Sequence, residues 1–148
     1  MGNREILFRG KRKDNGEWAY GDFCHPCNIV FEAIGYDAVL GQSDVPIIHD
    51  YEVIPETVGQ YTGLTDKNGK KIFEGDILQV ERDIQCSEKT KKRETTVGTV
   101  WFDIKSAEFG YESAGYYRCL TLKRWSGDSQ EVIGNIHDNP ELLEVHNA

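Results

Sequence analysis

Short apolar runs separated by glycine constrain the fold of this chain more than any other feature. The sequence holds 15 glycines in 148 residues. Most segments between them alternate in polarity or stay apolar for only about four to eight residues. Such segments lack the 3.6-residue spacing of an amphipathic helix and have the length of a strand. The sequence therefore predicts a mainly β fold, built of short strands and hairpins.

The N-terminal part is predicted to be a β-hairpin region. Residues 6–9 form one strand and residues 17–23 form the other, with Asn15 and Gly16 at the tip of a charged turn. Asn and Gly suit such a tip because they tolerate the positive φ of tight hairpin turns. Residues 37–40 fit either a short strand or a loop. Further strands are expected at 28–34 and 47–54.

The C-terminal two-thirds favour a small, partly open barrel, for which an SH3-like arrangement is one option. One short helix is expected at 140–145, with Asn139 as its N-cap and Pro140 in its first turn. The chain is treated as one protein over 1–148, with an optional subdivision near Pro55 into 1–55 and 56–148. Residues 58–63 look irregular and 83–94 look like a mobile, charged hairpin loop. Strands are expected at 77–82, 95–103, 109–111, 116–122 and 131–136.

The charge of the chain disfavours nucleic acid as a partner. The formal net charge is -8, and an acidic protein repels phosphate backbones on average. Two clusters of basic residues depart from this acidic average. The simpler interpretation of each cluster is an ordinary solvated surface. A nucleic-acid-binding barrel nevertheless remains an alternative. The clusters are Arg9, Lys11, Arg12 and Lys13, and Lys89, Lys91, Lys92 and Arg93.

The same sequence predicts a cytoplasmic protein. No apolar run approaches the roughly 20 residues that span a bilayer, and the charged N-terminus has no signal-peptide core. In the cytoplasm the four cysteines would stay reduced. We therefore expect no membrane partner and no disulfide.

Three separated blocks resemble the YopX family of phage and prophage proteins. Residues 58–77, VGQYTGLTDKNGKKIFEGDI, are similar to its central signature almost letter for letter. Residues 4–11 with 18–21 resemble its start, and residues 131–136 with 139–143 resemble its end. The resemblance implies a β-rich fold and an origin in a phage or prophage of a bacterial host. It implies no catalytic residue. The motif residues that we single out as structural are Gly59, Gln60, Tyr61, Gly63, Gly69, Glu74, Gly75, Asp76, Gly134 and Pro140.

Two parts of the central block also admit a functional interpretation. Glu74 and Asp76 flank Gly75, and paired carboxylates can perform acid–base catalysis or hold Mg²⁺. We favour a structural interpretation, in which Gly75 takes a backbone conformation that other residues resist and Asp76 accepts a backbone hydrogen bond at a strand entry. Gly59 and Gly63 could approach a phosphate, but they lack the strand-then-helix setting of phosphate loops.

Cys24 and Cys27 form a C-x-x-C pair, the spacing of a redox pair or of half a zinc site. A zinc site needs four ligands, and the other cysteines and histidines are scattered singly. We favour incidental thiols over a metal site, and we predict no cofactor.

No residue set in the chain specifies a reaction. The leading hypothesis is a non-enzymatic interaction protein that forms a homo-oligomer, with a host or phage protein as a further partner. Large aromatic residues support it, because Trp and Tyr are enriched at interfaces. The alternatives are a nucleic-acid-binding small β-barrel and, second, a metal-dependent enzyme or metal-binding protein.

Overall fold

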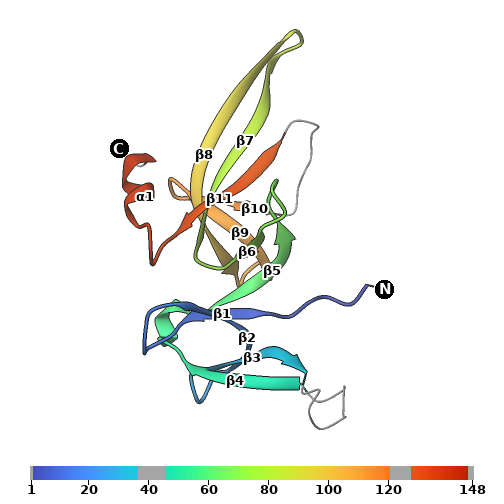
Figure 1. Cartoon of the computed structure of the whole chain (residues 1–148). Coiled ribbons are helices and arrows are strands. Elements are labelled where there is room, and N and C mark those ends of the chain that lie inside the picture. Colours follow the sequence, from blue (N-terminus) through green and yellow to red (C-terminus); the bar gives the residue numbers. More distant parts are fainter. Residues whose placement is uncertain (1, 37–45, 121–127, 147–148) are drawn as a thin grey trace. The chain divides into compact units, whose positions relative to one another are not determined.

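A computed structural model describes residues 2–36, 46–120 and 128–146 (Figure 1). The chain divides into two compact units, Met1–Tyr61 and Thr62–Ala148. The structure is mainly β, with antiparallel sheets and one short helix, as the glycine pattern predicted. Residues 37–40, and the end of the strand expected at 116–122, lie outside the described residues.

The first unit is a sheet with the strand order β4-β3-β2-β1-β5. A short 3₁₀ helix, η1 (Pro55–Thr57), precedes β5, and β5 pairs with β1 through Gly59 and Gln60. Strand β5 continues into the second unit. The strands are β1 (Phe8–Lys11), β2 (Trp18–Cys24), β3 (Ile29–Tyr36), β4 (Pro46–Glu52) and β5 (Gly59–Thr65).

The N-terminal hairpin is confirmed. Strand β1 begins two residues later than expected and pairs with β2 from Phe8 opposite Gly21 to Lys11 opposite Trp18. Gly16 has a φ of 74°, the left-handed conformation that the turn requires. The small core of this unit consists of Ala19, Val30 and Val53, all buried.

The second unit has a five-stranded antiparallel sheet with the order β10-β9-β8-β7-β11. On one face Leu78, Val80, Val100 and Tyr111 form a core with Ile72 of β6. The hairpin of β5 and β6 therefore covers that face. The strands are β6 (Lys71–Phe73), β7 (Asp76–Ser87), β8 (Thr90–Asp103), β9 (Glu108–Ser113), β10 (Tyr116–Cys119) and β11 (Ser129–Asn135).

The predicted C-terminal helix is confirmed as α1 (Glu141–His146). Its side chains lie close to Gly134 of β11: a Cβ on this glycine would come within 2.6 Å of Asn139 Oδ1 and 2.9 Å of Leu142 Cδ1. The Oδ1 atom of Asn139, expected to cap the helix, accepts a hydrogen bond from the Asn135 amide at 3.4 Å. The carboxamide thus ties the start of α1 to β11.

The strands do not close into the barrel that the sequence favoured. Strand β10 pairs with β9 and strand β11 pairs with β7, at opposite ends of the sheet. A closed barrel would need these end strands to pair with each other. In the part of the chain that the structure describes, they do not.

The charged segment 83–94 is a two-stranded ribbon, so the loop prediction was wrong. Strands β7 and β8 stay paired almost to their turn, and Figure 1 shows the ribbon projecting beyond β9 and β10. Opposite charges face each other across it, with Arg82 opposite Glu94 and Asp83 opposite Arg93. Such cross-strand pairs stabilise a sheet without any apolar alternation, which explains why the strand pattern was not recognised.

The segment 58–63, expected to be irregular, belongs to β5. The Tyr61 amide donates to the Leu7 carbonyl at 2.8 Å, and Thr62 Oγ1 donates to the Ile72 carbonyl at 2.9 Å. Leu7 directly precedes β1 and Ile72 lies in β6, so this segment forms hydrogen bonds with both neighbouring strands. Glycines at 59 and 63 hid this strand in the sequence, because glycine weakens strand propensity.

Candidate functional site

The β5–β6 turn is built around Asp66, which is 7% exposed. Its Oδ1 atom accepts hydrogen bonds from the Asn68 and Lys70 amides at 2.8 and 2.9 Å. Its Oδ2 atom accepts one from the Val132 amide of β11 at 3.0 Å. Gly69 closes the turn with a φ of 80°. One carboxylate therefore both shapes the hairpin and joins it to the edge of the five-stranded sheet.

The environment of Asp66 lowers the pKa of its carboxyl group. Burial acts in the opposite direction and is the largest single effect, but the amides of Val132, Lys70 and Asn68, with the charge of Lys70, together outweigh it. The carboxylate is therefore ionised in the folded chain at neutral pH. With both oxygens engaged by the backbone, this group fits a structural role.

The Gly75–Asp76 corner lies where β6 leads into β7. Gly75 has a φ of 84°, as the sequence predicted for a strained corner. Asp76 is 1% exposed, and its Oδ2 atom accepts the predicted backbone hydrogen bond, from the Phe73 amide at 2.8 Å. Glu74 is only half-buried. A carboxylate as inaccessible as that of Asp76 cannot touch a substrate in this conformation, which supports the structural interpretation.

The remaining motif residues are distributed over both units. Gly59 and Tyr61 are buried and Gln60 is half-buried, all three in the first unit. Gly63 has a φ of 87° in the second unit. Pro140 precedes α1, and its carbonyl accepts a hydrogen bond from the Leu143 amide at 3.2 Å. Their assignment as a structural motif stays a prediction.

An exposed apolar surface of the first unit lies on β3 and β4. Strand β4 is the end strand of the sheet, with β3 on one side and no described strand on the other. Ile47 is 40% exposed and Ile48 54%, and on β3 Phe31 is 39% and Ile34 50% exposed. We call this set, together with the outer edge of β4, the β4 edge. At the C-terminal end of this edge the Glu52 carbonyl accepts a hydrogen bond from the Lys13 amide at 2.9 Å, and along the rest of β4 no described strand pairs with the outer edge.

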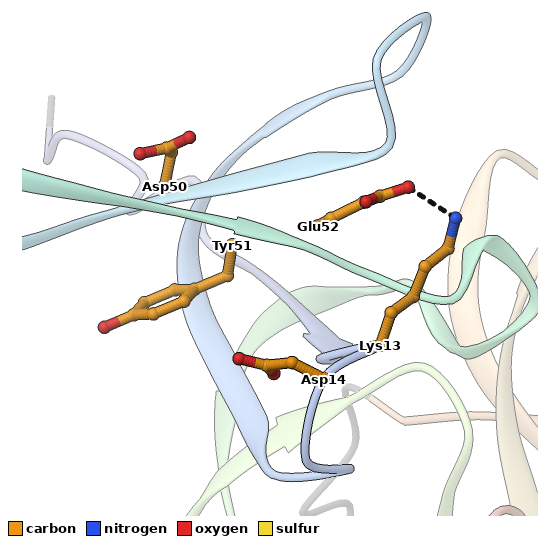
Figure 2. Close-up of a pocket in the computed structure, with 5 residues that line it drawn as sticks. All are labelled: Lys13, Asp14, Asp50, Tyr51 and Glu52. Atoms are coloured by element: carbon orange, nitrogen blue, oxygen red, sulfur yellow. Dashed lines mark hydrogen bonds and ion pairs between the residues drawn. The ribbon is translucent and has the colours of Figure 1, made fainter.

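A shallow pocket adjoins the C-terminal half of β4 (Figure 2). It has a volume of about 280 Å³ and is lined by Lys13 and Asp14, from the turn between β1 and β2, and by Asp50, Tyr51 and Glu52. Lys13 Nζ forms an ion pair with Glu52 Oε1 at 2.6 Å. Figure 2 shows Asp50 pointing to the opposite side of β4 from the Tyr51 ring. The pocket lining thus combines four charged side chains with one aromatic residue.

Arg12 contacts two of the residues that line this pocket, Tyr51 and Asp14. Its guanidinium lies 4.2 Å from the centre of the Tyr51 ring and donates hydrogen bonds to both carboxylate oxygens of Asp14. This hydrogen bonding, with the charge of Arg12, lowers the pKa of Asp14. The hydroxyl of Tyr51 is 3.2 Å from His49 Nδ1. The lining is polar and preorganised, but it holds neither a nucleophile with its base nor a set of converging metal ligands.

Cys24 and Cys27 lie together in the turn between β2 and β3, where the Cys27 amide donates to the Cys24 carbonyl at 3.2 Å. Over the described ranges, no group of three or more His, Cys, Asp or Glu side chains is placed to hold a metal ion. The two basic clusters belong to different units: in the first, Arg9 is buried against the ring of Trp18, and in the second, Lys91 and Lys92 are exposed on the β7–β8 ribbon.

Sequence reasoning predicted a turn at residues 65–71 but missed the role of the Asp66 carboxylate in it, and it missed the β4 edge. For Asp66 a signal was present: an aspartate at the start of a turn, three residues before a glycine, commonly accepts hydrogen bonds from the turn's own amides. Its third bond, to β11, comes from 66 residues away and had no local signal. The β4 edge depends on strand order, which a single sequence does not reveal.

The fold and its exposed features define a small, two-unit antiparallel β protein with a polar pocket and an end strand that exposes two isoleucines. The sequence profile of the YopX family, described as YopX protein, matches residues 7–144. The chain belongs to the YopX family.

A solved structure extends the likeness to the whole fold. The chain is similar to protein EF1440 from Enterococcus faecalis, known from a crystal structure, with 25% sequence identity and a TM-score of 0.53. The alignment covers 95% of this chain and 99% of that chain. A comparison with curated proteins gives no significant match. Within the described segments, no helix has the length and apolar character needed to cross a membrane.

Proposed function

We propose that this chain is a phage- or prophage-encoded, non-enzymatic interaction protein that self-associates through the β4 edge in the bacterial cytoplasm. One observation carries the proposal: the end strand β4 exposes Ile47 and Ile48, and no described strand pairs with its outer edge. An edge strand offers amides and carbonyls that another strand can satisfy. Lysine or an interior proline would discourage such pairing, and β4 has neither between Ile47 and Glu52.

A second copy of the chain suits this edge. In an antiparallel pairing of two β4 strands centred on Ile48, the two Ile48 side chains face each other. Asp50 of one copy then lies opposite Pro46 of the other, so that the acidic residues of the two copies do not meet. The contact is self-complementary, as a twofold dimer requires. Phe31 and Ile34 would extend the apolar area on each side.

The mass in solution tests the proposal. Light scattering after size exclusion at moderate salt is expected to give twice the 16.8 kDa of one chain. Ile48→Lys should give the single-chain mass, because it places two ammonium groups in the centre of the contact. Ile104→Lys, at a position 84% exposed in the second unit, is the matched control and should remain dimeric. A single-chain mass for the wild type, unchanged over a tenfold range of concentration, would refute self-association.

Nucleic-acid binding is the second candidate, and the tip of the β7–β8 ribbon favours it. Residues 88–92 carry three exposed lysines and one glutamate in a protein that is acidic overall. A projecting basic ribbon can follow a phosphate backbone. Retention on heparin or DNA at low salt, lost at moderate salt and abolished by replacing Lys89, Lys91 and Lys92 with serine, would select this function.

A further inference from the structure

The turn between β2 and β3 brings two thiols to one place. Cys24 ends β2 and lies opposite Ile29, the first residue of β3, so that only four residues connect the strands. The Cys27 amide donates to the Cys24 carbonyl at 3.2 Å, which closes a tight turn between the two cysteines. Asn28 follows with a φ of 53° and returns the chain into β3. The backbone therefore holds both residues close together.

The surrounding residues anchor this turn. The Asn28 carbonyl accepts a hydrogen bond from the Val53 amide at 2.9 Å, and Val53 belongs to the buried core of the unit. The ring of His25, between the cysteines, packs edge-on against Phe23 with 6.2 Å between ring centres. The turn is thus tied to the sheet on both sides, and its geometry is set before any ligand arrives.

The two thiols belong to one short turn. Cys24 and Cys27 are its first and last residues, joined by the backbone hydrogen bond from the Cys27 amide to the Cys24 carbonyl. Cys27 is exposed and Cys24 is half-buried. A ligand can therefore reach the pair from solvent.

We propose that Cys24 and Cys27 form a two-thiolate site for a soft monovalent metal ion of the copper(I) class. Thiolates select soft ions, and a monovalent ion of this kind accepts two ligands in a sulfur–metal–sulfur arrangement. Binding forms two metal–sulfur bonds and releases the two thiol protons, which leaves a complex of charge −1. Zinc is disfavoured because it takes four protein ligands in a structural site, and the described residues place no third ligand beside the pair.

The other two cysteines provide a built-in control. Cys86 lies on the β7–β8 ribbon, where its Sγ donates to the Ile84 carbonyl at 3.7 Å. Cys119, on β10, has its Sγ 3.1 Å from Glu108 Oε2. Neither shares a tight turn with another thiol. A chain that lacks these two cysteines keeps the proposed site, and a chain that lacks Cys24 or Cys27 loses it.

The test is a competition for copper(I), with the full-length reduced chain and bicinchoninate as the chelator under anaerobic conditions. We expect one ion per chain, and a loss of affinity of at least about 100-fold in Cys24→Ser and in Cys27→Ser, since even residues that only support a ligand cost 10–100-fold. Cys86→Ser/Cys119→Ser should bind as the wild type does. Circular dichroism checks that each variant keeps its β signal.

Three results would overturn the site. The first is unchanged copper(I) affinity in the folded Cys24 and Cys27 variants. The second is an equal loss in the Cys86/Cys119 variant, which would mean non-specific thiol binding. The third is retention of one zinc ion per two chains in preference to copper(I), with a doubled mass that depends on zinc, which would mean a four-thiolate bridge between two copies.

Discussion

Replacing Asp76 with alanine is expected to lower the free energy of unfolding by about 2–3 kcal/mol. The substitution leaves the buried Phe73 amide without the carboxylate oxygen that accepts its hydrogen bond at 2.8 Å. It also removes a side chain that is 1% exposed, so solvent does not replace the lost partner. For a unit of this size, each kcal/mol corresponds to about 4–8 °C in Tm. Thermal and urea unfolding measure the change.

Two variants separate the hydrogen bond from the other properties of the side chain. Asp76→Asn keeps an acceptor oxygen and the side-chain volume, so it should lose less stability than Asp76→Ala. Glu74→Ala, at the half-buried neighbour, should also cost less. If Glu74→Ala/Asp76→Ala melted like the wild type but no longer self-associated, these carboxylates would belong to a functional site and the structural interpretation would be wrong.

Local turn chemistry accounts for the parts of the fold that the sequence predicted. Gly16 and Gly75 both take the positive φ that their positions suggested, and these residues mark the hairpin tip and the strand corner. The short helix followed from Asn139 and Pro140 in the same way. Such features depend on a few adjacent residues, so a single sequence contains all the information they need.

The errors came from features that depend on distant parts of the chain. The β7–β8 ribbon is held by charge pairs between residues about 10 apart, such as Asp83 and Arg93, which look like a solvated loop when each strand is considered alone. Whether strands form a barrel depends on the order of all of them, and the sequence did not give that order. The β4 edge is the same kind of feature: the strand itself was expected, but its position at the end of a sheet was not.

Replacing Asp66 with alanine is expected to be at least as damaging as the change at Asp76, with a loss of about 3 kcal/mol at neutral pH. Three backbone amides lose their acceptor together: those of Asn68 and Lys70 in the turn and that of Val132 in β11. Hydrogen bonds to a charged group are stronger than those to a neutral one. The substitution therefore weakens both the β5–β6 turn and its connection to β11 at the edge of the sheet.

Asp103 provides the matched control for this prediction. It is also a turn aspartate, and its Oδ1 atom accepts a hydrogen bond from the Lys105 amide at 3.1 Å, while Ser106 Oγ donates to Oδ2 at 2.7 Å. These partners are two and three residues away. Asp103→Ala removes a local network of similar size but breaks no bond to another strand, so it should cost clearly less stability than Asp66→Ala.

The pH dependence of stability tests whether the stabilisation by Asp66 comes from its negative charge. Folding lowers the pKa of this carboxyl group, so between the folded and unfolded pKa values the unfolded chain binds more protons. The stabilisation is therefore fully present above the unfolded pKa, about 4, and is lost as the pH falls through the lower folded value. Asp66→Asn has no carboxyl group to protonate, and its stability should fall less steeply with acid between about pH 5 and pH 2. Urea unfolding of both proteins across this range measures the two slopes. Equal slopes of stability against pH would contradict this prediction. The hydrogen bonds that join the β5–β6 turn to β11 would then be equally strong with a neutral side chain at position 66.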